Sequence, residues 1–256
     1  MNNTVDSNEK HIQSFSRYEF KYILKKSLSD KIENESKYFM QRDSHTNKDL
    51  GNRYFVRSLY FDNQFSSNFF EKVDGMKIRS KYRLRTYSDV FDKNIPIFLE
   101  MKGRINERTY KIRTKIKHEH LGYFLDQSKH ISLLNIYSHN NLVIKNFVFD
   151  CLRKKIFPRV LVDYKRRPYI NKFGLYFRLT FDSNILASKT KNLFTNDNFS
   201  SYLECRAGYT ILEVKFDRSI PPWFHRIIQN YNLRRLSISK FVIGMEKCGI
   251  AQETST

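Results

Sequence analysis

The segment from Met76 to Tyr87 alternates between cationic and apolar side chains with a period of two. The cationic positions are Lys77, Arg79, Lys81, Arg83 and Arg85, and the apolar positions between them include Ile78, Tyr82 and Leu84. Successive side chains of a β-strand point to opposite faces, so this pattern predicts a strand with one cationic and one apolar face. The fold must therefore accommodate a row of five like charges along one face of a sheet.

The same alternation recurs along the chain and indicates a fold rich in β-structure. The predicted strands are Phe15–Leu24, Arg53–Asp62, Met76–Tyr87, Pro96–Ile105, Thr109–Lys117, Pro158–Tyr169, Gly174–Asp182 and Tyr209–Asp217. Helices are predicted at Ser29–Met40, Phe65–Val73, Asn140–Ile156 and Pro222–Tyr231, and polar loops near Gln41–Asn52, Ser88–Asn94 and Ser188–Ser201. The short connections favour antiparallel pairing. The predicted fold class is α+β, with about eight strands.

Two architectures satisfy strands that have one cationic and one apolar face. In a sandwich the cationic faces would look outward to water, whereas in a closed barrel they would line the interior beneath an apolar outside covered by helices. Five like charges on alternate residues repel one another, and a solvated face usually mixes charge signs. The predicted helices also need an apolar sheet face to pack on. We therefore expect a closed antiparallel β-barrel with helices packed on the outside.

A cationic interior is reasonable only if a polyanion or water fills it, because buried charges otherwise lose their hydration. The whole chain carries 46 Lys and Arg against 26 Asp and Glu, which gives a formal net charge of +20. Such an excess opposes compaction and favours an anionic partner. Composition alone does not separate nucleic acid, an anionic membrane and polyphosphate-like ligands, and a generally basic surface is the simplest alternative.

Several classes of protein are disfavoured by features that the sequence lacks. It has no GxxxxGK or GxGxxG loop, no HExxH motif, and no stretch approaching the roughly 18 apolar residues of a membrane helix. The start, MNNTVDSNEKH, has no apolar segment, so we expect no secretory signal. Cys151, Cys205 and Cys248 are odd in number and far apart, which fits reduced thiols in the cytoplasm. His118 and His120 lie in a polar stretch and are predicted to be solvated.

The chain contains no Pro-rich or Ser-rich linker and no internal repeat. We expect a loose polar leader at residues 1–12, a single domain at 13–250 and a short tail at 251–256.

Eight short segments resemble the VTC domain, the catalytic domain of vacuolar transporter chaperone polyphosphate polymerases and a branch of the triphosphate tunnel metalloenzymes. They are RYEFKY (Arg17–Tyr22), SLYFDN (Ser58–Asn63), YRLRTY (Tyr82–Tyr87), LEMKGR (Leu99–Arg104), DYKRRPY (Asp163–Tyr169), FRLTFD (Phe177–Asp182), ILEVKF (Ile211–Phe216) and SISKF (Ser237–Phe241). The resemblance runs from about Phe15 to about Glu246. It implies an antiparallel barrel whose tunnel holds a triphosphate and a divalent metal, Mn²⁺ or Mg²⁺.

The resemblance also assigns roles to individual residues. The implied phosphate-binding and catalytic bases are Lys21, Arg83, Arg85, Lys102, Lys111, Arg166, Arg178 and Lys240, with Arg113 an equally good candidate to Lys111 by phase. Further substrate contacts are implied for Lys81, Arg113, Tyr164, Lys215 and Ser239, and metal binding for Glu213. The chemistry agrees, because Arg and Lys suit phosphate oxygens and hard cations prefer oxygen ligands.

The remaining acids and one departure from the family pattern refine this picture. Glu19 and Glu100 lie in phase with the bases, and we expect them to form internal salt bridges that hold neighbouring bases in place. The wider superfamily carries Glu-x-Glu-x-Lys on its first strand. Here Arg17 replaces the first acid, which is closer to the polymerase branch and argues mildly against a two-metal hydrolase.

Three functions remain open on this basis. The first is an ATP-dependent polyphosphate polymerase, the second a metal-dependent hydrolase of inorganic or organic triphosphate, and the third a non-enzymatic binder of nucleic acid or polyphosphate. Aromatic side chains fall mainly on the face opposite the bases, which favours packing over base stacking, and no specific nucleic-acid recognition is expected. We expect a cytoplasmic protein. In the printed sequence no phosphate-sensing bundle precedes the matched region and no membrane helices follow it, so product export would require a separate membrane partner.

Overall fold

The computed structural model of the chain describes residues 17–43, 52–137, 141–174, 176–195 and 201–253. The predicted leader, residues 1–12, and the last part of the predicted tail lie outside the described residues.

Ten strands of the described chain form one antiparallel sheet. They are β1 (Tyr18–Lys25), β2 (Met40–Arg42), β3 (Tyr54–Asp62), β4 (Ile78–Thr86), β5 (Ile97–Ile105), β6 (Arg108–Ile116), β7 (Phe157–Asn171), β8 (Phe177–Ser188), β9 (Leu203–Cys205) and β10 (Tyr209–Phe216). The principal order is β1-β10-β8-β7-β3-β4-β5-β6, with β2 paired to β7 and β9 to β8. The eight predicted strands are confirmed. The short strands β2 and β9 were not predicted.

The sheet does not close into a barrel, so this part of the prediction is wrong. Its two outer strands, β1 and β6, meet at one isolated bridge, where Arg17 and Thr109 exchange two main-chain hydrogen bonds of 3.4 Å. Closure needs a continuous ladder with a fixed stagger between the outer strands. Beyond the bridge the connection is made by side chains instead, because Lys102 of β5 binds the Glu19 carboxylate of β1 at 3.1 Å.

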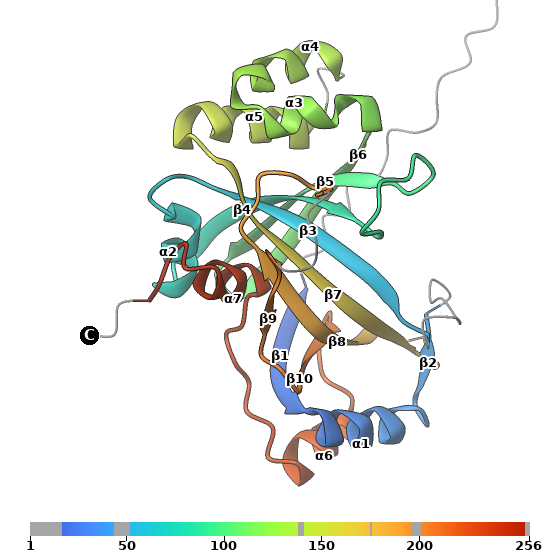
Figure 1. Ribbon diagram of the computed structural model, residues 1–256. Coiled ribbons are helices and arrows are strands. Elements are labelled where there is room, and N and C mark those ends of the chain that lie inside the picture. The colour runs from blue at the N-terminus through green and yellow to red at the C-terminus, as the bar shows by residue number, and fades with distance from the viewer. Residues whose placement is uncertain (1–16, 44–51, 138–140, 175, 196–200, 254–256) are drawn as a thin grey trace, which may run out of the picture.

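Helices pack on the apolar outer face of the sheet and at one end of its inner face (Figure 1). They are α1 (Lys26–Ser36), α2 (Ser67–Val73), α3 (Leu121–Leu125), α4 (Leu133–Ile136), α5 (Leu142–Lys154), α6 (Pro222–Asn230) and α7 (Lys240–Lys247), with 3₁₀ turns at His118–His120 and Gln127–Ser132. In Figure 1, α3, α4 and α5 lie together at one end, and α1 and α6 at the other. No described helix has the length and apolar character needed to cross a bilayer.

The alternation within β4 explains why the two faces of the sheet differ. Tyr82 and Leu84 are buried in the outer apolar cluster, where the Tyr82 ring lies 5.4 Å from that of Phe147 on α5. Asn141 precedes α5, and its side chain accepts a hydrogen bond from the Ile144 amide, which satisfies part of the helix start. The outer face therefore carries a large part of the apolar core, and a further cluster lies on the inner face. The charged side chains of β4 point to the inner face.

Helix α7, which was not among the predicted helices, carries Lys240 to the inner side of the sheet. Its Gly244 lies against β7: a Cβ at this position would come within 2.9 Å of Val162 Cγ2 and 3.2 Å of Val160 Cγ2. The absence of a side chain thus lets α7 approach β7 closely, with Lys240 one turn earlier.

We predict that Gly244→Val lowers the free energy of unfolding by about 1–3 kcal/mol, because the added atoms overpack this contact. Denaturant unfolding measures the change. Gly122→Ala is the matched control, since a Cβ on Gly122 meets nothing within 4 Å. Equal stability of the two variants would contradict the close approach of α7.

Candidate active site

The inner face of the sheet lines a cavity of about 700 Å³. Every residue to which the sequence assigned a site role contributes to its wall. These are Lys21, Lys81, Arg83, Arg85, Lys102, Lys111, Arg113, Tyr164, Arg166, Arg178, Glu213, Lys215, Ser239 and Lys240. The structure therefore brings together fourteen side chains from strands that are distant in sequence. Their roles remain predictions.

The five alternating cationic side chains of the Met76–Tyr87 segment lie in three places. Lys81, Arg83 and Arg85 line the cavity. Arg79 lines an adjoining cavity of about 330 Å³, and Lys77 is exposed beside an outer pocket. A sandwich would place all five of these side chains in bulk water. It therefore does not describe Lys81, Arg83 and Arg85, which line the cavity.

The charge of the cavity wall is strongly positive. Among the described side chains that line it, twelve are basic and three are acidic, namely Glu19, Asp43 and Glu213. Glu100 and Asp182 lie behind this wall and pair with its bases, but they leave a clear excess of positive charge. Such a wall favours a polyanion, because the ligand supplies the compensating charge that the protein does not.

Glu100 holds Arg83 in a fixed orientation. Its carboxylate is fully buried and accepts hydrogen bonds from Arg83 Nε and Nη2 at 2.8 and 2.6 Å. Burial alone would raise the pKa of Glu100, but Arg83 and Arg85 hold it well below its usual value. The carboxylate is therefore ionised, and it aligns the guanidinium as the sequence predicted.

Arg85 is buried among mainly neutral partners. Its Nη2 donates to the Tyr164 hydroxyl at 2.9 Å and to Ser58 Oγ at 3.2 Å. The nearest acidic contact is Glu100, at 3.8 Å. The charge of Arg85 is less compensated than that of Arg83, which makes it well suited to bind a phosphate group.

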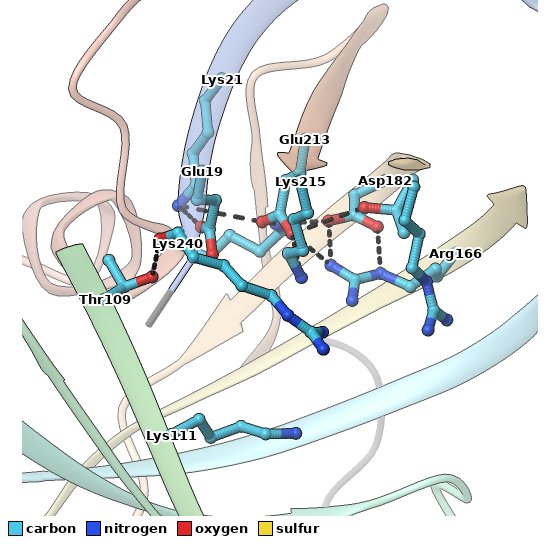
Figure 2. A network of polar contacts seen from close by, with 12 residues as sticks. Glu19, Lys21, Thr109, Lys111, Arg166, Asp182, Glu213, Lys215 and Lys240 are labelled. Atoms are coloured by element: carbon cyan, nitrogen blue, oxygen red, sulfur yellow. Dashed lines mark hydrogen bonds and ion pairs between the residues drawn. The ribbon is translucent and has the colours of Figure 1, made fainter. Parts of the chain in front are cut away.

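A second buried network surrounds Glu213 (Figure 2). Lys240 Nζ lies 2.8 Å from Glu213 Oε1 and 2.5 Å from Asp182 Oδ2. Arg166 binds Asp182 through two hydrogen bonds of 2.6 and 2.7 Å and reaches Glu213 at 2.9 Å. Burial opposes ionisation of Glu213, yet Lys240 and Arg166 hold its pKa well below the usual value. Two acids and two bases thus compensate one another, so Arg166 and Lys240 have less free charge for a ligand than the sequence suggested.

Glu19 links β1 to β5 through two lysines that line the cavity. Its carboxylate lies 3.0 Å from Lys21 Nζ and 3.1 Å from Lys102 Nζ. Burial alone would raise the pKa of Glu19, but Lys102 and Lys21 lower it well below its usual value. The predicted internal salt bridges of Glu19 and Glu100 are therefore both present.

Several cavity lysines lack enough acidic neighbours. Lys81 donates to Ser239 Oγ at 2.9 Å, and its ammonium lies 4.9 Å from the centre of the Phe241 ring. Burial, then the charges of Lys102 and Lys21, lower the pKa of Lys81 well below its usual value. Burial likewise lowers the pKa of Lys111 to about 7, although Glu100 acts against this shift. A bound polyanion would favour the protonated form of these groups.

We predict that the affinity for inorganic tripolyphosphate falls as the pH rises from 7 to 9. Lys111 is partly neutral in the free protein above pH 7, so binding must take up a proton, and the affinity decreases with pH by up to tenfold per unit for each such group. Titration calorimetry at several pH values measures this. Lys111→Met should reduce the slope, whereas the exposed-site variant Lys117→Met should keep it. Identical slopes in all three proteins would contradict the linkage.

A divalent metal could be held here only with help from a ligand. Among the described residues, no group of three or more His, Cys, Asp or Glu side chains is placed to hold a metal ion. Glu213 lines the cavity, and its oxygens already face Lys240 and Arg166. Mg²⁺ and similar cations often use one or two carboxylates together with substrate phosphates and waters. The residues fit a cation shared between Glu213 and phosphate, and they do not fit a site made of protein ligands alone.

Sequence reasoning missed two kinds of residue. Aromatic side chains were expected opposite the bases, but Tyr54, Tyr60, Tyr87, Phe98 and others line the cavity together with them. The alternation could have identified Tyr87, because it occupies the next alternate position after Arg83 and Arg85 and so lies on the same face. Asp182 was not assigned a role, although it is fully buried beneath Lys240.

Comparisons with known proteins give a family and a set of distant structural neighbours. A sequence model of the family described as VTC domain matches residues 16–248. No curated protein matches the chain. A protein from Pyrococcus horikoshii is 15% identical, with 90% of this chain and 99% of that chain covered and a TM-score of 0.47.

Two further solved structures resemble the chain at a similar level. A candidate adenylate cyclase from Bacillus halodurans is 11% identical over 88% of this chain and 94% of that chain, with a TM-score of 0.46. A candidate adenylyl cyclase from Hippeastrum, described as having a dominant triphosphatase activity, is 12% identical over 91% and 96%, with a TM-score of 0.49.

Proposed function

The chain belongs to the VTC-domain family, and from this premise we propose that it is a phosphotransferase that extends polyphosphate with the γ-phosphoryl group of ATP. The proposal rests on the cavity of the inner face, in whose wall twelve described basic side chains meet three acidic ones. Phosphoryl transfer needs in-line placement and neutralisation of charge more than covalent help from the protein. A wall of this kind supplies the neutralisation of charge.

In the proposed reaction a terminal oxygen of the polyphosphate chain attacks the γ-phosphorus of ATP. A new P–O bond forms, the bond to the β,γ-bridging oxygen breaks, and ADP leaves. Both reactants are anionic, so they repel one another unless nearby cations screen them. Arg83 and Arg85 present planar donor groups to the phosphate oxygens, and Glu100 fixes the first of them. A divalent cation held by Glu213 and phosphate would supply further neutralisation.

The uncompensated bases are the feature that favours a polymerase over a triphosphate hydrolase. A hydrolase brings a neutral water to one triphosphate, whereas a polymerase must hold two polyanions together. Arg17 lies at the cavity in the position where the wider superfamily carries an acid, so a base that pairs with Asp217 stands there in place of a carboxylate. The same cavity could nevertheless place a water molecule, so the two reactions are separated by experiment.

The test is to incubate the full chain with γ-labelled ATP, a short polyphosphate primer and Mn²⁺, and to separate the products on a gel. We expect the label in a ladder of chains, and no ladder when the metal is chelated. Label released only as orthophosphate would reject polymerisation and identify a hydrolase. Salt-sensitive RNA binding without either product would indicate a non-enzymatic binder.

A further inference from the structure

The wall of the main cavity changes character along β4. Alternate side chains of this segment point inward. Their order along the chain, read backwards, is Tyr87, Arg85, Arg83, Lys81 and Arg79. An aromatic ring thus stands at one end of a row of four cations. The main cavity therefore has a direction, with an aromatic end and an end where bases predominate and Glu19 lies among them.

Three rings form the aromatic end. Tyr87 lies 5.8 Å from Tyr54 and 6.4 Å from Phe98 between ring centres, in edge-on arrangements. All three are partly exposed and line the cavity. The Arg113 guanidinium lies over Phe98 at 4.6 Å from the ring centre. This set of rings and a planar cation is suited to contact a flat, weakly polar ring system.

The opposite end has no such surface. The adjoining cavity shares Lys21, Lys81, Lys102 and Ser239 with the main one. Its own cationic residues include Lys72, Arg79, Arg104 and Arg235, and no described aromatic side chain lines it. A nucleobase placed there would be surrounded by charge without a ring to stack on.

We propose that Tyr54, Tyr87 and Phe98 form a nucleobase subsite that fixes the direction in which a nucleoside triphosphate enters the cavity. Four residues of strand span about 13 Å, so a base at Tyr87 lies about that distance from Arg83. This spacing lets the phosphates extend past Arg85 towards Arg83 and Lys81. The opposite orientation separates the base from every ring of the aromatic end. The inference rests on the proposed function, because it assumes a nucleotide substrate for this cavity.

The experiment compares three ligands that share a triphosphate but differ in what it carries. ATP has a base, ribose 5′-triphosphate has the same phosphates without a base, and inorganic tripolyphosphate has neither base nor sugar. Their dissociation constants are measured by calorimetry for the full chain and for the variants Tyr87→Leu and Phe98→Leu. Tyr38→Leu is the control, since Tyr38 is 78% exposed and lines neither cavity.

We expect each variant to weaken ATP binding by about tenfold, a change typical of one lost base–ring contact, and to change the other two ligands by less than twofold. Equal weakening of all three ligands would mean that the rings only support the fold, and unchanged ATP binding would mean that the base lies elsewhere. Either result overturns the inference. A selective loss of ATP affinity supports it even if no polyphosphate is made. Wild-type protein that binds none of the three would instead overturn the proposed function, and the subsite with it.

Discussion

Arg85→Ala should lower the rate of polyphosphate synthesis by about 100- to 1,000-fold, the usual effect of removing one preorganised cationic donor from a transfer site. Arg85 is the better choice for this test because its partners are mainly neutral hydroxyls. Its removal leaves no acid unpaired, since Glu100 keeps two hydrogen bonds from Arg83. The loss should therefore appear in turnover and not in folding.

Initial rates with labelled ATP measure this effect, and circular dichroism and thermal unfolding establish that the variant is folded. Arg153→Ala is the matched control, because Arg153 is exposed on α5, where it pairs with Asp150 and lies over the Phe149 ring, away from the cavity. Arg83→Ala is less informative, since it would also leave the buried Glu100 without its main partner. A folded Arg85→Ala protein with near-normal turnover would remove this residue from the site.

Asp182→Ala should lower the free energy of unfolding by about 3–5 kcal/mol, the cost typical of removing one member of a buried ion pair. Asp182 is fully buried, and its two oxygens are bound by Arg166 and Lys240. Without it, two buried cations would share the single carboxylate of Glu213. The penalty comes from the uncompensated charge that remains, more than from the lost contact itself.

Denaturant unfolding at neutral pH provides the measurement. Glu119→Ala serves as the control, because Glu119 is 68% exposed and pairs with Lys117 and His120 at the surface. Exposed pairs of this kind contribute about 0–1 kcal/mol. If both variants lost the same small amount of stability, this would contradict a buried network in which Asp182 and Glu213 balance the charges of nearby bases.

The period-two alternation predicted most of the sheet and part of the cavity wall. Alternation is a local property, so it fixes which side chains of one strand share a face whatever the rest of the chain does. The parity of Lys81, Arg83 and Arg85 was enough to place them together, and the apolar partners Tyr82 and Leu84 pack under α5 as expected.

Features that depend on the whole chain were harder to predict. Closure of the barrel depends on the stagger between β1 and β6, which no single segment specifies, and the two strands meet at one bridge only. The strands β2 and β9 are three residues long and show too little alternation to recognise. Helix α7 follows a polar run that favours a turn, and Asp182 gains its importance only from Lys240, a partner distant in sequence.

A crystal structure of the full chain with a non-hydrolysable ATP analogue and Mn²⁺ would show whether the cavity binds the nucleotide. We expect a triphosphate inside the main cavity, with its oxygens within hydrogen-bond distance of Arg83 and Arg85 and the metal between Glu213 and phosphate. An analogue bound on the outside of the sheet, with the cavity holding only water, would contradict this expectation.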